Sequence, residues 1–257
     1  MRPLRLLRRA ALALAATLGT GAAWAGHYPM YASWPQPGGP GTAITLSYSY
    51  ANLLDGGIAT AAGVPLPARV LRGAVEQALA EYAAILPIHF MEVADAGPLP
   101  ETGPYDPAGL ADIRIGHVPH VDGANAYAYF PVEPQVDGLA GDIVFNARRF
   151  GFGWTATLFY GVVQHELGHA LGMGHYVADG ADAQSLLGGA SAYDGPLFPF
   201  DDATIAALQG VYGAGTGSVT PLSAVPEPAT WALLAAGLAT LGAAVRNTRS
   251  ARNRITA

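Results

Sequence analysis

Three histidines and one glutamate, clustered in a single stretch, carry most of the reactive chemistry in this sequence. The stretch VVQHELGHALGMGHYV, residues 162–177, contains His165, Glu166, His169 and His175. His165 and His169 are four residues apart, so in an α-helix both imidazoles leave the same face. Because imidazole nitrogens are common zinc ligands, this pair could share one zinc ion. Surface histidines that happen to fall four residues apart are the alternative interpretation.

The third ligand must come from outside that helix. His175 follows His169 by six residues, which on a continuous helix would place it on the wrong side. A turn at Gly172, with further freedom at Gly174, would bring it back to the metal. Glu166 is about 100° around the helix from the first histidine, so it suits a general base better than a ligand. The spacing therefore predicts a hydrolytic zinc site with one open position.

The elements needed to position this site follow from the periodicity of the apolar residues. The active-site helix is expected over residues 156–171. Further helices are expected over 67–84 and 201–213, and strands over 42–50, 88–94, 111–118 and 141–146. This order predicts an α+β (mixed α/β) domain, which we place at residues 26–215.

The zinc stretch resembles the H-E-x-x-H-x-x-G-x-x-H signature of the metzincin proteases. The segments ADIRIG, AYFP, GDIVFN and DDATIAALQGVYG also resemble, in this order, segments of the matrixins, a metzincin group. The resemblance covers residues 33–213. It implies a twisted, mostly parallel sheet, an active-site helix and a C-terminal helix. It also implies that His165, His169 and His175 bind zinc and that Glu166 is the catalytic base.

The chain departs from the matrixin pattern at several positions. Metzincins carry a methionine in a turn beneath the zinc, where this chain has Leu187, or Leu186 if the alignment shifts by one. Leucine is apolar and of similar volume, so it could pack there instead. Tyr127 and Val144 stand where the animal enzymes have histidine ligands of a structural zinc. Tyr193 is a candidate for lining the substrate pocket or assisting the oxyanion, or else a packed loop aromatic.

Four aspartates are candidates for a structural calcium site, because carboxylate oxygens are the ligands that calcium prefers. They are expected in loops or at strand ends, and they are Asp112, Asp122, Asp137 and Asp142. Turn formation and helix capping are the alternative roles for such residues.

Composition and charge exclude several kinds of site and partner. The chain of 257 residues has no cysteine, which excludes disulfides, thiolate metal sites and a cysteine nucleophile. Its net charge is −6, and residues 26–224 hold five arginines against 18 acidic residues, a balance of about −13. So acidic a domain argues against a nucleic-acid partner.

The two ends of the chain carry sorting features. Residues 1–25 have four arginines, an apolar run and an Ala-Trp-Ala ending, which predicts a signal peptide cleaved after Ala25 by signal peptidase. A linker is expected over residues 216–224. Residues 225–257 start at Val225, have Pro-Glu-Pro at 226–228, continue with an apolar stretch from Ala229 to Val245 and finish in a tail that contains four arginines. That apolar stretch is close to the shortest length that spans a bilayer, so a single transmembrane helix is predicted.

The C-terminal segment resembles a PEP-CTERM sorting signal. The resemblance implies recognition by an exosortase-type enzyme and a location in the Gram-negative envelope or extracellular matrix. A simple membrane tail anchor is the alternative.

Together these features predict an exported zinc-dependent endopeptidase that acts on a protein or peptide substrate. The alternative is a non-catalytic cell-surface or biofilm-matrix protein that keeps a protease-like scaffold. Glu166 favours the enzyme, and the missing methionine favours the scaffold. A hydrolase of non-peptide substrates is disfavoured by the eleven-residue zinc signature.

Overall fold

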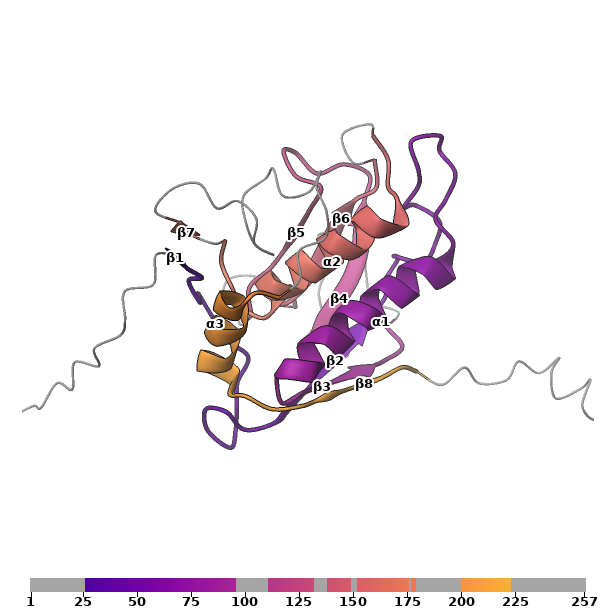
Figure 1. The fold of residues 1–257 in the computed structure, drawn as a ribbon. Coiled ribbons are helices and arrows are strands. Elements are labelled where there is room, and N and C mark those ends of the chain that lie inside the picture. The colour runs from indigo at the N-terminus through magenta and orange to yellow at the C-terminus, as the bar shows by residue number, and fades with distance from the viewer. Residues whose placement is uncertain are drawn as a thin grey trace, which may run out of the picture.

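One six-stranded sheet, covered on one face by two long helices, forms the framework of the protein in a computed structural model (Figure 1). The structure describes residues 26–95, 111–131, 138–148, 152–175, 177–178 and 200–222.

The sheet has the strand order β5-β6-β4-β2-β3-β8 and is parallel except for the edge pair β5–β6. Its strands are β2 (Ile44–Ser49), β3 (Ile88–Glu92), β4 (Ile113–Val118), β5 (Ala126–Ala128), β6 (Ile143–Asn146) and β8 (Ser218–Thr220). All four residues of β6, and all but one residue of β4, are buried. Central parallel strands are typically covered in this way and read as nearly continuous apolar runs. The mostly parallel sheet that the resemblance implied is confirmed.

The helices α1 (Ala68–Ile85) and α2 (Ala156–Ala170) pack against each other in front of the sheet (Figure 1). Helix α1 buries a stripe of residues with spacings of three and four, which a helix places on one face. These residues are Leu71, Ala74, Val75, Ala78, Leu79, Tyr82 and Ala83. The third helix, α3 (Asp202–Tyr212), lies near the C-terminal end of α2.

Two of the helices begin at side-chain caps. The Thr155 hydroxyl accepts a hydrogen bond from the Leu158 N–H at 3.2 Å, which starts α2. The Asp201 carboxylate accepts one from the Thr204 N–H at 2.6 Å, which starts α3. Each cap satisfies a backbone donor that has no partner within the first helical turn. The helix starts predicted from the sequence are therefore confirmed.

The predicted linker over residues 216–224 is partly wrong. Residues Ser218–Thr220 form β8, which pairs in parallel with β3 at the edge of the sheet. A three-residue edge strand is too short to show an alternating pattern, so the sequence gave no reason to expect it. The sheet consequently extends beyond the predicted domain boundary at residue 215. The short β5 was missed for the same reason.

A second pairing joins the start of the described chain to the zinc stretch. Strand β1 (Gly26–His27) runs antiparallel to β7 (Val177–Ala178), and Met30 forms an antiparallel bridge with Met173. We call residues 26–34 the N-terminal strap. Nothing in the sequence indicated this pairing, because a contact across some 150 residues leaves no local pattern.

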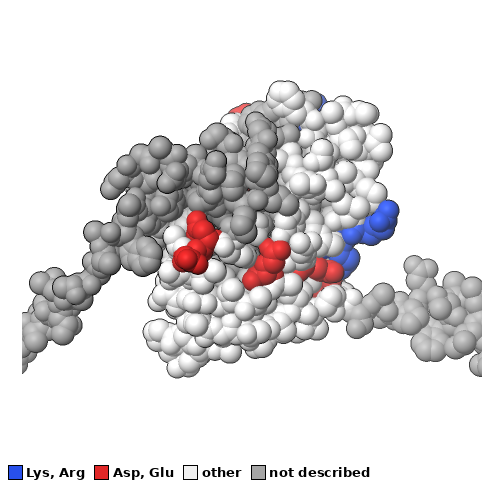
Figure 2. Space-filling view, viewed as in Figure 1, with Lys and Arg blue, Asp and Glu red and all other residues white. Residues whose placement is uncertain are grey.

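The predicted sorting segments fall outside the described residues. Within the part of the chain that the structure describes, no helix is both long and apolar enough to cross a membrane. The apolar stretch from Ala229 to Val245 and the predicted signal peptide over 1–25 lie outside it. On the face shown in Figure 2, the described surface is mostly uncharged, with separate acidic groups and basic side chains towards one edge.

Candidate metal centre

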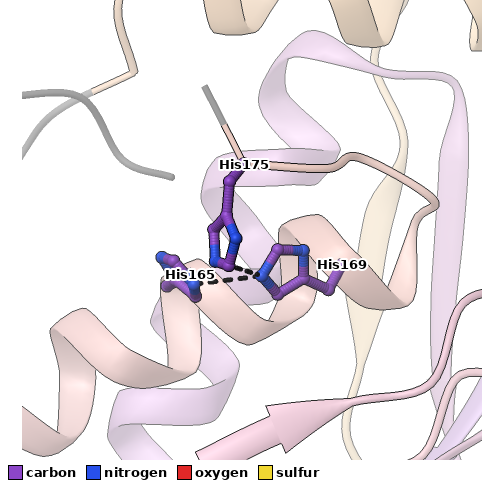
Figure 3. A group of neighbouring side chains, drawn as sticks. All are labelled: His165, His169 and His175. Carbon is purple, nitrogen blue, oxygen red and sulfur yellow. Dashed lines mark hydrogen bonds between the residues drawn. The ribbon is translucent and has the colours of Figure 1, made fainter. Parts of the chain in front are cut away.

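Three histidine side chains meet at the C-terminal end of α2 (Figure 3). His169 Nε2 lies 3.0 Å from His165 Nε2 and 3.3 Å from His175 Nε2. One ligand atom from each histidine lies within 4.8 Å of the other two. The first two side chains project from consecutive turns of α2, and the third points back at them from the loop beyond (Figure 3).

The chain reverses at Gly172, as the sequence predicted. Gly172 has a φ of +95°, a left-handed conformation that glycine adopts without strain. Its N–H donates to the His169 carbonyl at 2.7 Å, and the Met173 N–H donates to the Gly168 carbonyl at 2.9 Å. These two bonds are the Schellman pattern that ends many helices. The turn is what allows His175 to approach the two helical histidines.

A hydrogen bond made by His169 determines which of its ring nitrogens carries the proton and which has a free lone pair. Its Nδ1 lies 2.6 Å from the Met173 carbonyl oxygen. A carbonyl oxygen only accepts, so Nδ1 carries the proton and donates it. In the neutral ring, Nε2 then holds a lone pair directed at the other histidines. Metal-binding histidines are commonly oriented by this kind of bond from the second nitrogen.

Desolvation keeps His169 and His175 neutral. It lowers the pKa of His169 to about 4, an effect that the bond to the Met173 carbonyl opposes and the nearby His175 reinforces. Burial also lowers the pKa of His175. The neutral imidazole is the form that binds a metal, so both side chains are ready as ligands near neutral pH.

Glu166 stands beside this cluster without a hydrogen-bonding partner for one of its oxygens. The residue is buried, and its Oε2 makes no hydrogen bond to any described residue. Burial raises the pKa of this carboxyl to about 8. An unpaired buried carboxylate is costly, and a cation held by the neighbouring histidines would reduce that cost.

The distances in the cluster suit a zinc ion. Four nitrogens placed tetrahedrally around zinc at Zn–N distances of about 2.0–2.1 Å lie roughly 3.3 Å apart. The two separations measured from His169 Nε2, 3.0 and 3.3 Å, are close to this value. The donor atoms, their protonation and the unpaired Glu166 oxygen all fit a zinc ion at this position.

Two aromatic rings extend the site towards the solvent, and sequence reasoning missed them. The Phe130 ring packs edge-on against His169, with 5.9 Å between ring centroids. The Tyr31 ring packs edge-on against Phe130 at 5.2 Å, and Tyr31 is 65% exposed. No sequence signal could have linked these residues, because about 100 positions separate Tyr31 from Phe130.

The described aspartates of the calcium prediction lie in three different surroundings. Asp112 accepts hydrogen bonds from the backbone N–H and the hydroxyl of Ser47, both at 2.7 Å. Asp122 is on the surface, where it is hydrogen-bonded to His120 at 2.8 Å. Asp142 is buried and accepts a hydrogen bond from the Arg114 N–H at 3.1 Å. Each of the three therefore has a partner within the protein, and Asp137 lies outside the described residues.

Arg114 provides the positive charge next to Asp142. Its guanidinium Nε donates to Asp95 at 2.7 Å, and its Nη1 lies 3.5 Å from an Asp142 oxygen. Asp95 also accepts a hydrogen bond from the Ser49 hydroxyl at 2.7 Å. Burial raises the pKa of Asp142 to about 8, although Arg114 opposes the shift. We call Arg114, Asp95 and Asp142 the buried arginine cluster.

Of the positions where the chain departs from the matrixin pattern, two lie in the described structure and the others do not. Tyr127 and Val144 are direct partners across the β5–β6 pair. Leu187, its neighbour Leu186, and Tyr193 lie outside the described residues.

Residues 224–250 match the PEP-CTERM protein-sorting motif. The predicted sorting signal is therefore confirmed, and it begins two residues after the last described residue, Leu222. The motif implies a protein that is exported to the cell envelope or surface and recognised by an exosortase-type sorting enzyme.

Proposed function

We propose that this protein is an exported zinc-dependent endopeptidase of matrixin type. The observation that carries the proposal is the meeting of His165, His169 and His175 beside the buried Glu166. Beside the three histidines, the buried Oε2 of Glu166 has no hydrogen-bonding partner among the described residues, and a cation held by the histidines would lie next to it.

The three histidines would hold the zinc ion through their Nε2 atoms. When bound, zinc supplies a Lewis acid that polarises a peptide carbonyl and makes a water molecule more acidic. With three protein ligands, one coordination position stays open for chemistry. His175 is the exposed member of the three, so a substrate would approach from its side.

Glu166 would act as the general base and then the general acid. It takes a proton from the water whose oxygen attacks the peptide carbonyl carbon, and it passes that proton to the leaving nitrogen as the C–N bond breaks. A carboxyl whose burial raises its pKa can both accept and release a proton near neutral pH.

The test is a comparison of the purified full-length protein with its Glu166→Ala variant. Zinc content is measured by elemental analysis, and cleavage of an unstructured protein is followed by gel electrophoresis. We expect one zinc per chain in both proteins and cleavage by the unmodified protein alone. Bound zinc without any Glu166-dependent cleavage would reject the endopeptidase and favour the non-catalytic surface scaffold.

A further inference from the structure

The N-terminal strap is hydrogen-bonded to the turn that leads from the ligand helix to His175. The Tyr31 N–H donates to the Gly172 carbonyl at 2.8 Å. Two residues further along the turn, the Gly174 N–H donates to the Pro29 carbonyl at 2.7 Å. The strap thus holds the turn from both sides of Met173, immediately before the third histidine.

The strap and α3 also satisfy the free carbonyls at the end of α2. The last carbonyls of a helix have no partner within the helix. The Trp34 indole N–H donates to the Ala170 carbonyl at 2.9 Å, and the Tyr212 hydroxyl donates to the Leu171 carbonyl at 2.8 Å. With the strap bond to Gly172, three consecutive carbonyls each accept one hydrogen bond from another part of the chain. The end of the ligand helix is therefore fixed from outside.

The contact between strap and turn is too close for side chains larger than glycine. A Cβ atom at Gly172 would lie 2.0 Å from the Ala32 carbonyl oxygen. A Cβ atom at Gly174 would lie 2.3 Å from the Tyr31 ring and 2.8 Å from the Pro29 ring. Gly172 also needs its positive φ, but Gly174 does not have one. The requirement for glycine at position 174 therefore comes from the strap alone.

We propose that the N-terminal strap is a positioning element for the metal site, which holds the turn so that His175 reaches the other two histidines. This inference rests on the zinc site of the proposed function. A turn that is already ordered loses less conformational freedom when a metal binds, so the strap raises the affinity for zinc. The proposal assigns Tyr31 and Gly174 a function although neither residue is a ligand.

The decisive variant is Gly174→Ala, in which the new methyl group pushes against the Tyr31 ring. Zinc affinity of the purified full-length protein is measured by competition with a chromogenic chelator. We expect a loss of about 10- to 100-fold, the range typical of losing a residue that orients a ligand. Gly73→Ala is the matched control, because nothing lies within 4 Å of a Cβ atom there, and its affinity should equal that of the unmodified protein.

A double variant separates positioning from general damage. In Tyr31→Ala/Gly174→Ala the ring that the new methyl group meets most closely is gone and only the Pro29 contact remains, so zinc affinity should recover in part relative to Gly174→Ala. Cobalt(II) in place of zinc gives a second readout. The strong visible bands of four-coordinate cobalt should weaken in Gly174→Ala and return in the double variant.

Tyr31→Ala alone keeps the test decisive if Gly174→Ala does not fold. It preserves the backbone bonds of the strap but removes the ring that packs against Phe130 and covers Gly174. It should therefore bind zinc more weakly while its zinc-free circular dichroism spectrum is unchanged. Unchanged zinc affinity and an unchanged cobalt spectrum in Tyr31→Ala, and in Gly174→Ala if that variant folds, would overturn the proposal. If the strap variants bind zinc weakly but the unmodified protein cleaves no substrate, the positioning role of the strap is supported and the endopeptidase proposal is rejected.

If the unmodified protein cleaves substrate and the strap variants bind zinc as tightly as it does, the endopeptidase proposal is supported and the positioning role is rejected.

Discussion

The three-histidine site and the buried arginine cluster both gather polar side chains inside the protein, but they differ in how their charges are balanced. In the buried arginine cluster, the Arg114 guanidinium lies between the carboxylates of Asp95 and Asp142. At the histidine site, Glu166 has a buried oxygen with no described partner, and no lysine or arginine is paired with it among the described residues.

This difference distinguishes a polar cluster that contains its own counter-charge from one that does not. A cluster that contains its own counter-charge needs nothing from outside, and its carboxylates are poor candidates for calcium. A cluster that lacks a counter-charge, and whose ring nitrogens point at one another, has a place for a cation that the chain does not supply.

The largest effect should come from removing the internal cation. Arg114→Met leaves the buried Asp95 carboxylate without its counter-charge, and breaking such a pair from one side costs about 3–5 kcal/mol. The free energy of unfolding, measured in urea, should fall by this amount. Arg148→Met is the control, since Arg148 is exposed and its loss should have little effect. Equal stability of the two variants would show that the cluster does not hold the fold.

Zinc binding at the histidine site should raise the free energy of unfolding by an amount similar to the Arg114 effect, and this amount should depend on the zinc concentration. Because only the folded state arranges the three ligands, free zinc at a hundred times its dissociation constant should add about 2.7 kcal/mol to the free energy of unfolding. Thermal melting with zinc, and then with excess chelator, measures the difference. His169→Ala should abolish the zinc effect, whereas His89→Ala should retain it, because the half-buried His89 lies on β3 and is not part of the cluster. A melting temperature that does not change when zinc is added would contradict zinc binding by the three histidines.

The pH dependence of stability should report on Asp142. Its pKa is raised above the ordinary value of 3.8 to about 8 in the fold, so the folded state binds a proton more tightly than the unfolded state. That contribution is complete below pH 3.8 and is lost as the pH rises towards 8. Asp142→Asn should remove this contribution and flatten the stability profile between these values. A variant profile parallel to that of the unmodified protein would show that Asp142 does not titrate in this range.

The smallest effect is expected at Asp122. Its side chain is 99% exposed and its histidine partner is 61% exposed, so the pair is well screened by water. Asp122→Ala should leave the free energy of unfolding and the zinc affinity unchanged. A calcium-dependent rise in melting temperature that this variant loses would instead support the calcium prediction.

Local sequence patterns predicted much of the fold. The apolar spacing of the helices and the apolar runs of the strands were sufficient to place the main helices and four of the six strands of the sheet. Each of these signals acts over a few residues, where helix and strand periodicity is decided. The strands that were missed have two or three residues each and depend on partners far along the chain.

The sequence by itself determined which residues can bind a metal and where the chain turns. The four-residue spacing of His165 and His169, and a glycine at position 172, are local facts with local consequences. Tertiary structure decided how His175 is held in place. It also decided which acidic side chains lie next to an arginine. The bonds from the strap and from Tyr212, and the guanidinium beside Asp142, join segments up to 178 residues apart. Such contacts are selected by the burial and hydrogen-bonding needs of the whole fold, so no local pattern predicts them.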